Sequence, residues 1–154
     1  MVFREGISGK ISIDSNLITN IDLYDLRKHY FSVCEQVPVV FENTLEFNLF
    51  LGEEVDQESV CLLNDLSFDL AKYRLVDHVA SSLLSGGEKQ KIAIARTMLR
   101  DNPIEIYDEP TASLDYSSKM GLIKCIDERK DEKIIIIISH DKDILAICDE
   151  IISL

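Results

Sequence analysis

Two short segments of the sequence carry residue types that handle phosphate and metal chemistry. Ser85-Gly86-Gly87-Glu88 opens a predicted helix, and Tyr107-Asp108-Glu109-Pro110 ends an apolar strand. Glycine amides at a helix start bind anions, because no side chain blocks them and the helix dipole is positive there. Adjacent carboxylates supply a Mg²⁺ ligand and a group that polarises water, which phosphoryl transfer to water requires. Together the two segments predict chemistry on ATP.

Each segment also has a plain structural interpretation. Ser85 and Glu88 have the spacing of a capping box, in which the serine caps the helix. This interpretation is compatible with anion binding, since a capped helix end still presents free amides. Asp108 and Glu109 taken alone are also typical of a solvated acidic turn after a strand.

Three further polar residues stand at predicted strand or helix ends. Gln36 follows a strand and precedes Pro38, so its amide either contacts a metal and the attacking water or is an ordinary loop side chain. His140 follows the apolar run 134–138 and either donates to a phosphate or caps the next helix. Asp115 is typical of the N-cap of a helix.

The elements that must position these side chains alternate between strands and helices. The pattern predicts strands over 10–13, 30–34, 104–107 and 134–138, and the beginning of one at 151–152. It predicts helices over 23–28, 86–100, 115–129 and 141–148, the first capped by Asp22. From Thr44 to about Tyr73 it predicts helical periodicity in two segments, one starting at Thr44 and another with Leu62 and Leu66 on its apolar face. The isoleucine run at 134–138 is typical of a parallel strand covered on both faces. This alternation implies a doubly wound α/β core.

Bulk composition restricts the function classes. A chain of 154 residues fits one domain, and a net charge of −12 argues against binding nucleic acid through its phosphates. No apolar run approaches the ~20 residues of a membrane span, and no secretory signal is recognisable, so membrane association requires a partner. The cysteines match no zinc pattern and are expected to be buried free thiols: Cys34, Cys61, Cys125 and Cys148.

The order and spacing of these segments resemble the nucleotide-binding domain of ABC-type ATPases over nearly the whole chain. Ser85 to Glu88 resembles the family's signature motif, and Ser113-Leu114-Asp115 resembles its D-loop. Gln36 resembles the Q-loop glutamine and His140 the switch histidine. The resemblance implies roles for the following residues: Gln36, Glu109 and His140 in catalysis, Asp108 and Gln36 on Mg²⁺, and Ser85, Gly86, Gly87, Glu88 and Asp115 in binding ATP.

The resemblance also implies an architecture and partners. It implies a P-loop NTPase-like, mostly parallel sheet core at 1–37 and 99–154, with a helical subdomain at 38–98 that carries the signature motif. Two such domains, identical or different, would pack head to tail with ATP between them. The stretches 9–14 and 33–45 are similar to the exporter branch, which implies a transmembrane partner and a place at the cytoplasmic face of the membrane.

The sequence departs from the family pattern in one respect with large consequences. It contains no G-x-x-x-x-G-K-[ST] loop, the P-loop that holds the phosphates. Aligned by its motifs, the chain begins within the helix after that loop and ends before the family's C-terminal elements, so the fold is expected to be incomplete at both ends. Losing several charge-assisted hydrogen bonds costs on the order of 5–10 kcal/mol, and each ~1.4 kcal/mol is tenfold in affinity. We therefore expect the isolated chain neither to bind ATP tightly nor to turn it over.

Three functional interpretations remain open at this point. The first is an exporter ATPase domain, the second a non-catalytic remnant or regulatory half that supplies its signature motif to a partner, and the third a soluble ABC ATPase of DNA repair or translation. Two structural questions also remain. The missing strand is expected to leave an unpaired sheet edge. Glu105 lies in an otherwise apolar strand, where it either faces that gap or pairs with a basic side chain.

Overall fold

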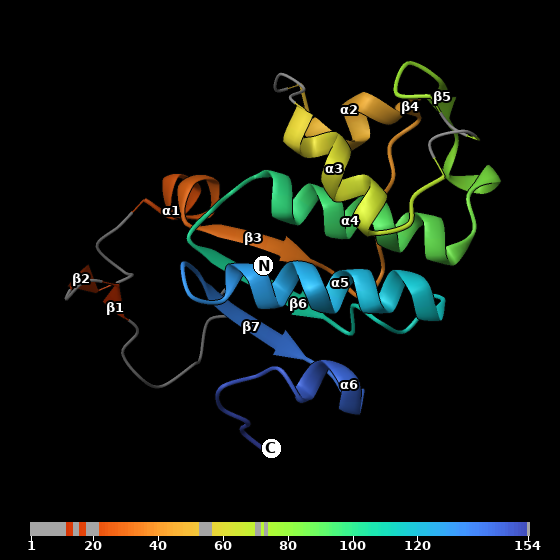
Figure 1. Ribbon diagram of the computed structural model, residues 1–154. Coiled ribbons are helices and arrows are strands. Elements are labelled where there is room, and N and C mark those ends of the chain that lie inside the picture. The colour runs from red at the N-terminus through yellow and green to blue at the C-terminus, as the bar shows by residue number, and fades with distance from the viewer. Residues whose placement is uncertain are drawn as a thin grey trace.

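The computed structural model describes residues 12–13, 16–17, 22–52, 57–69, 72 and 74–153. Its main sheet consists of the parallel strands β3 (Phe31–Cys34), β6 (Ile104–Asp108) and β7 (Ile134–Ile138), in the order β3-β6-β7. Helix α4 (Gly86–Leu99) precedes β6, and helix α5 (Tyr116–Arg129) connects β6 to β7 and lies across the sheet (Figure 1). The predicted α/β architecture with a parallel sheet is confirmed.

One face of this sheet forms the core. Cys34, Tyr107 and Ile137 share a register position, so their side chains point to the same face. On that face Cys34 and Tyr107 are fully buried. Helix α4 covers it at Gln90, whose Nε2 donates to Cys34 Sγ at 3.5 Å. Helix α5 covers it near its C-terminal end, where Arg129 reaches the sheet.

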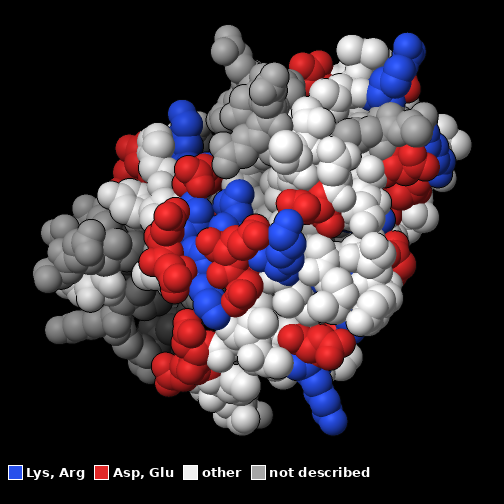
Figure 2. Space-filling model, viewed as in Figure 1, with Lys and Arg blue, Asp and Glu red and all other residues white. Residues whose placement is uncertain are grey.

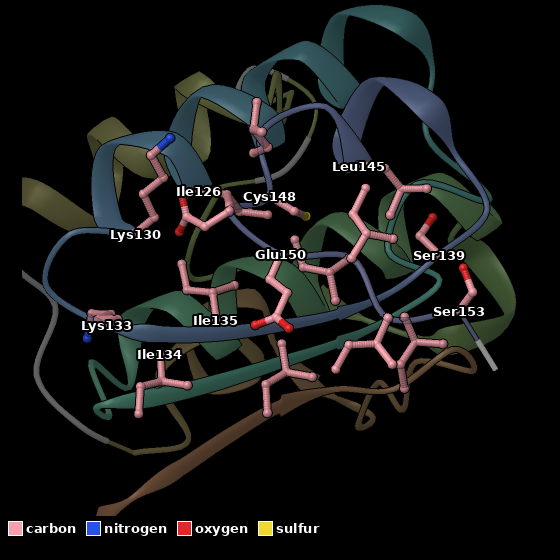
Figure 3. Close-up of a pocket in the computed structure, with 17 residues that line it drawn as sticks. Ile126, Lys130, Lys133, Ile134, Ile135, Ser139, Leu145, Cys148, Glu150 and Ser153 are labelled. Atoms are coloured by element: carbon pink, nitrogen blue, oxygen red, sulfur yellow. The ribbon is translucent and has the colours of Figure 1, made fainter.

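The opposite face of β7 corrects the expectation that this strand is covered on both sides. Ile134, Ile136 and Ile138 point there and are 62%, 46% and 54% exposed among the described residues. The reason is position, since β7 is the outermost strand of the described sheet and pairs only with β6 in it. A cavity of about 920 Å³ runs along β7 from Lys133 to Ser139 and is bounded by Ile126 of α5, by Lys130 just after that helix, by Leu145 and by residues 147–153 (Figure 3). The strand predicted at 151–152 does not form.

The shorter helices have the predicted type of secondary structure, but their lengths differ from the predicted ones. Asp22 caps α1 (Leu23–His29) by accepting from Tyr24 N at 2.7 Å, as predicted. The two helical segments predicted between Thr44 and Tyr73 form as α2 (Leu45–Phe50) and α3 (Gln57–Asp65), and positive φ angles at Leu51 and Gly52 end α2. Tyr73, Lys10 and Ile11 lie outside the described residues.

The remaining elements are these: β1 (Ser12–Ile13) paired with β2 (Asn16–Leu17), β4 (Asn43–Thr44) paired with β5 (His78–Val79), the 3-10 turn η2 (Ser81–Leu83) and α6 (Lys142–Leu145). Helix α6 is shorter than the predicted 141–148. No helix in the described ranges is both long and apolar enough to cross a membrane.

The cysteines follow the prediction with one exception. Cys34 and Cys125 are buried, and burial raises their pKa values to about 12 and about 11. Cys148 is half-buried. Cys61 is exposed on α3, so the expectation of a buried thiol is wrong there.

Charged side chains of both signs interleave on the face seen in Figure 2. Ion pairs along α5 contribute to this pattern, among them Lys124 with Asp65 and Lys130 with Asp127. The surface on that side is therefore mixed rather than uniformly acidic.

Candidate active site

The carboxyl ends of the three parallel strands bring one group of predicted site residues to the same edge of the sheet. Asp108 is the last residue of β6 and lies opposite Ile138, the last residue of β7. Gln36 is exposed in the bend after β3, two residues beyond Cys34, which pairs with Tyr107. This edge is where parallel sheets place their ligands.

Glu109 directs its carboxylate along this edge through an unusual backbone conformation. Its φ of 45° lies in the left-handed region, which costs a non-glycine residue roughly 1–2 kcal/mol. Its amide donates to Ile138 O at 2.8 Å, which extends the sheet by one step. Its carboxylate then contacts the end of β7, where Ser139 Oγ donates to Oε2 at 3.5 Å. Backbone strain of this kind is often found at functional sites.

His140 contacts Glu109 directly. Its Nδ1 lies 3.0 Å from Glu109 Oε1, while the imidazole remains largely exposed. The hydrogen bond to Glu109 and its negative charge raise the pKa of His140 above the usual 6.5. The alternative in which His140 caps the next helix is wrong, because Asp141 caps α6 by accepting from Asp143 N at 2.9 Å.

A second group of predicted residues lies at the N-terminus of α4. Ser85 Oγ accepts from Glu88 N at 3.2 Å, and Glu88 Oε2 accepts from Ser85 N at 2.8 Å, so the predicted capping box is present. Lys72 Nζ lies 2.6 Å from Glu88 Oε1. Burial opposes the charge of Glu88, but the hydrogen bonds from Lys72 and Ser85 outweigh it and lower its pKa to about 2.

The amides of Gly86 and Gly87 have no hydrogen-bond acceptor among the described residues, so they stay available to an anion. A Cβ on Gly87 would lie 2.8 Å from Ser113 O, whereas one on Gly86 would lie no nearer than 3.7 Å from Ser113. Glycine at 87 thus permits the close approach of the segment that follows Glu109.

Asp115 joins this second group through α5. It caps that helix by accepting from Ser118 N at 2.9 Å, as predicted. Its Oδ2 also lies 3.3 Å from the ammonium of Lys91 on α4, and Lys91 donates to Ser67 O at 2.9 Å. The hydrogen bonds from Ser118, together with Lys91, lower the pKa of Asp115. The structure therefore forms two groups in one chain, one around Glu109 and one around Gly86, with residues 110–115 between them.

Sequence reasoning missed several side chains that support these groups. Ser139 is the polar residue between the isoleucine run and His140, a position that signals it in retrospect. Arg96 gives no such signal, because its partners are backbone groups distant in sequence: it donates to Asn48 O at 2.7 Å and to Val39 O at 3.0 Å. Arg96 thereby attaches the segment after Gln36 to α4.

The residues at the strand ends fit a partly hydrated Mg²⁺. The described residues contain no group of three or more His, Cys, Asp or Glu placed to hold a metal. Mg²⁺ bound with a nucleotide commonly uses one or two carboxylates and takes its other ligands from water and phosphate. Asp108, at the end of β6, and Gln36, in the bend after the adjacent strand β3, are the kind of donors that such an ion takes.

Comparisons with known proteins give the relatives of this chain. A family model described as ABC transporter matches residues 2–112. The chain is 32% identical to the "Probable ABC transporter ATP-binding/permease protein" of Haemophilus influenzae, over all of this chain and 29% of that protein. It is 32% identical to the "ATP-dependent lipid A-core flippase" of Saccharophagus degradans, over 97% of this chain and 27% of that protein. It therefore spans less than a third of these relatives' lengths.

A solved structure has the same fold. "Structure of a bacterial Atm1-family ABC exporter with ATP bound" superposes with a TM-score of 0.80 at 26% identity, covering 90% of this chain and 26% of that one.

Proposed function

The chain belongs to the ABC transporter family. We propose that it is the ATP-binding cassette of an exporter, which couples ATP binding and hydrolysis to transport. The similar proteins carry the words permease, flippase and exporter in their names. Those names favour the exporter over a soluble ATPase of DNA repair or translation.

The contact between Glu109 and His140 is the observation that carries this proposal. A strained backbone places the Glu109 carboxylate 3.0 Å from His140 Nδ1. In the proposed site Glu109 accepts a proton from the attacking water, and His140 donates to the γ-phosphate. Asp108 and Gln36 hold Mg²⁺, which when bound would neutralise phosphate charge.

The second group of residues serves a different nucleotide in this proposal. Ser85, Gly86 and Gly87 offer a hydroxyl and two free amides, and Glu88 keeps the helix end ordered through the capping box. Asp115 holds the adjacent segment to Lys91. We propose that this surface binds ATP held by a second nucleotide-binding domain, identical or different, packed head to tail.

An exposed apolar surface supports a membrane partner. It lies after Gln36 and comprises Val37, Val39 and Phe41, which are 77%, 55% and 46% exposed. Phe41 packs edge-on against Phe47 with ring centroids 6.0 Å apart, so the surface is preformed. We propose that it contacts the transmembrane part of the exporter, which would hold the cassette at the cytoplasmic face of the membrane.

We also propose that the cassette is divided into an α/β core at 1–37 and 99–154 and a helical subdomain at 38–98.

A nucleotide titration of the purified chain tests the proposal. We expect millimolar Mg·ATP to shift the backbone NMR signals of Gly86 and Gly87 and of residues 108–109, with no shift at the C-terminal end of α5. Ser85→Ala is expected to reduce the shifts at Gly86, and Glu42→Gln, an exposed control, to leave them unchanged. Shifts at neither group in a folded chain would overturn the proposed function.

Activity of the 154-residue chain is a separate question. We propose that the chain alone does not turn ATP over, since its sequence contains no P-loop. A phosphate-release assay checks this point. Steady turnover that disappears in Glu109→Gln would contradict it while supporting the role of Glu109.

A further inference from the structure

Lys119 on α5 makes contacts that the predicted site does not account for. Its ammonium lies 3.3 Å from Asp141 Oδ2 and 2.5 Å from Asp143 Oδ2. The Lys119 side chain is only 19% exposed and that of Asp141 only 22%, so this ion pair is partly shielded from solvent. It joins α5 to the turn that contains His140.

A continuous set of hydrogen bonds leads from Lys119 to Glu109. The Asp141 amide donates to Ser139 Oγ at 3.1 Å, and Ser139 Oγ donates to Glu109 Oε2 at 3.5 Å. Between these two residues, His140 places Nδ1 3.0 Å from Glu109 Oε1. The turn at 139–141 therefore presents two side chains to one carboxylate, and Lys119 holds its far end.

Lys119 lies on a part of α5 that is capped at its start and packed into the core. It lies one turn into α5, where its amide donates to Asp115 O at 2.9 Å, and Asp115 caps the helix. Leu122, one turn further along α5, is fully buried. Without the ammonium, Asp141 and Asp143 would face each other as two carboxylates with no cation between them, and their repulsion would favour a different turn.

We propose that Lys119 is a positioning residue for Glu109 and His140: it fixes the turn at 139–141 so that His140 and Ser139 both contact the Glu109 carboxylate. The importance of this role for ATP rests on the proposed function. The positioning itself is a property of the free chain and is measurable without nucleotide.

The imidazole of His140 reports on the contact. The charged groups that face it in the described structure are Glu109 and Asp141, and both raise its pKa, Glu109 through the hydrogen bond and Asp141 through its charge. Loss of the Glu109 contact would lower the pKa of His140 towards the ordinary value of about 6.5. Loss of a positive charge nearby, with the turn unchanged, would raise that pKa instead. The direction of the change thus separates positioning from simple charge.

The experiment is an NMR titration of His140 in the purified full chain, with the signal assigned through His140→Gln. We expect Lys119→Met to shift the pKa of His140 downward, towards the ordinary value of about 6.5, and Lys119→Arg to keep the wild-type value. Lys142→Met removes a cation two residues from His140 but outside this set of contacts, and we expect it to leave that pKa unchanged or slightly higher.

The outcomes are decisive in both directions. A pKa of His140 that stays constant or rises in folded Lys119→Met would overturn the proposal, as would a downward shift in Lys119→Arg equal to that in Lys119→Met. If Lys119→Met does not fold, Lys119→Gln, which keeps a donor for Asp141 but no charge, is measured by the same criterion: an intermediate downward shift supports the role, and no shift or a rise rejects it. Failure of ATP to bind would leave this result unaffected.

Discussion

The Tyr107 hydroxyl donates a 2.6 Å hydrogen bond to Glu105 Oε2, and both side chains are fully buried in the covered face of the sheet. Arg129 and Lys133 lie 3.5 and 3.8 Å from Glu105 Oε1. Of the two sequence-based alternatives for Glu105, pairing with basic side chains is therefore the correct one. Burial raises the pKa of Glu105, while the hydrogen bond from Tyr107 and the two cations oppose that rise.

Replacing Glu105 tests whether this buried group stabilises the fold. We expect Glu105→Ala to lower the free energy of unfolding by about 3 kcal/mol, because the Tyr107 hydroxyl is left buried without an acceptor. The loss stays at the lower end of the roughly 3–5 kcal/mol that breaking a buried ion pair costs, because Arg129 and Lys133 retain Asp101 as a second partner. Urea unfolding measures it, with the exposed Glu132→Ala as control.

A double-mutant cycle sharpens the interpretation. Adding Tyr107→Phe to Glu105→Met removes donor and acceptor together. The double variant should therefore lose less unfolding free energy than the sum of the losses measured in Tyr107→Phe and in Glu105→Met alone. Additive losses would mean that the 2.6 Å hydrogen bond carries no coupling energy.

The case of Glu105 illustrates what the sequence can and cannot predict. The strand at 104–107 is predictable from its apolar residues, and in the structure it ends one residue later, at Asp108. The partner of Glu105 is not predictable, because Arg129 is distant in sequence and reaches the sheet only through the way α5 crosses it. The exposure of Ile134 is likewise not predictable, because the apolar pattern of a strand does not indicate whether the strand lies at the centre or at the edge of its sheet.

In the candidate site, too, some residue positions are predictable from the sequence and others are not. Strand-end positions place Gln36, Asp108 and His140 at one edge from sequence alone, because parallel strands end together. The approach of Gly87 to Ser113 depends on the path of residues 110–115 in three dimensions. That path begins with the left-handed conformation of Glu109, which no local sequence rule predicts for a glutamate.

The two glycines at the start of α4 should respond differently to alanine. A Cβ on Gly87 would lie 2.8 Å from the Ser113 carbonyl oxygen, a backbone atom that cannot rotate away. We expect Gly87→Ala to destabilise the chain by about 1–3 kcal/mol. Gly86→Ala, with 3.7 Å of room, should be neutral or stabilising by up to about 1 kcal/mol, because alanine favours helix.

Urea unfolding of both variants checks this contrast. Equal stability of the two alanine variants would show that residues 110–115 move aside at no cost and do not depend on the close approach at Gly87.

Glu88 should make the free energy of unfolding depend on pH in the acidic range. Its pKa is lowered from 4.5 to about 2 in the fold, so its contribution is complete above the unfolded value and is lost as the pH falls towards about 2. We expect Glu88→Gln to be less stable than wild type at pH 7 by on the order of 1 kcal/mol, since the half-exposed Lys72 weakens the pair by solvent screening. The difference should shrink as the pH falls below 4.5 and be lost below about 2.

Thermal unfolding at a series of pH values measures the difference, and the exposed Glu42→Gln serves as the matched charge change. A gap between wild type and Glu88→Gln that persists unchanged at pH 2 would argue that Glu88 acts through its shape in the capping box and not through its charge.

Gly121 should be the glycine of α5 that sets how closely α3 approaches. A Cβ there would lie 1.9 Å from Asp65 O and 2.9 Å from Asp65 C, both backbone atoms at the end of α3. We expect Gly121→Ala to lower the free energy of unfolding by about 3 kcal/mol, because α3 must move away from α5. Lys124→Met, on the same helix as Gly121, removes only the exposed ion pairs with Asp65 and Glu128, so it should cost less than about 1 kcal/mol.

The displacement should also reach the second group of site residues. Ser67, just beyond α3, accepts from Lys91 Nζ at 2.9 Å, and its hydroxyl lies 3.0 Å from that of Ser117 in the first turn of α5. Moving α3 must therefore strain the link between Lys91 and Asp115, and the backbone NMR signals of residues 115–118 should shift in Gly121→Ala but not in Lys124→Met. If Gly121→Ala is destabilised and those signals stay in place, α3 packs against α5 without supporting Asp115, and the second group is held by α4 alone.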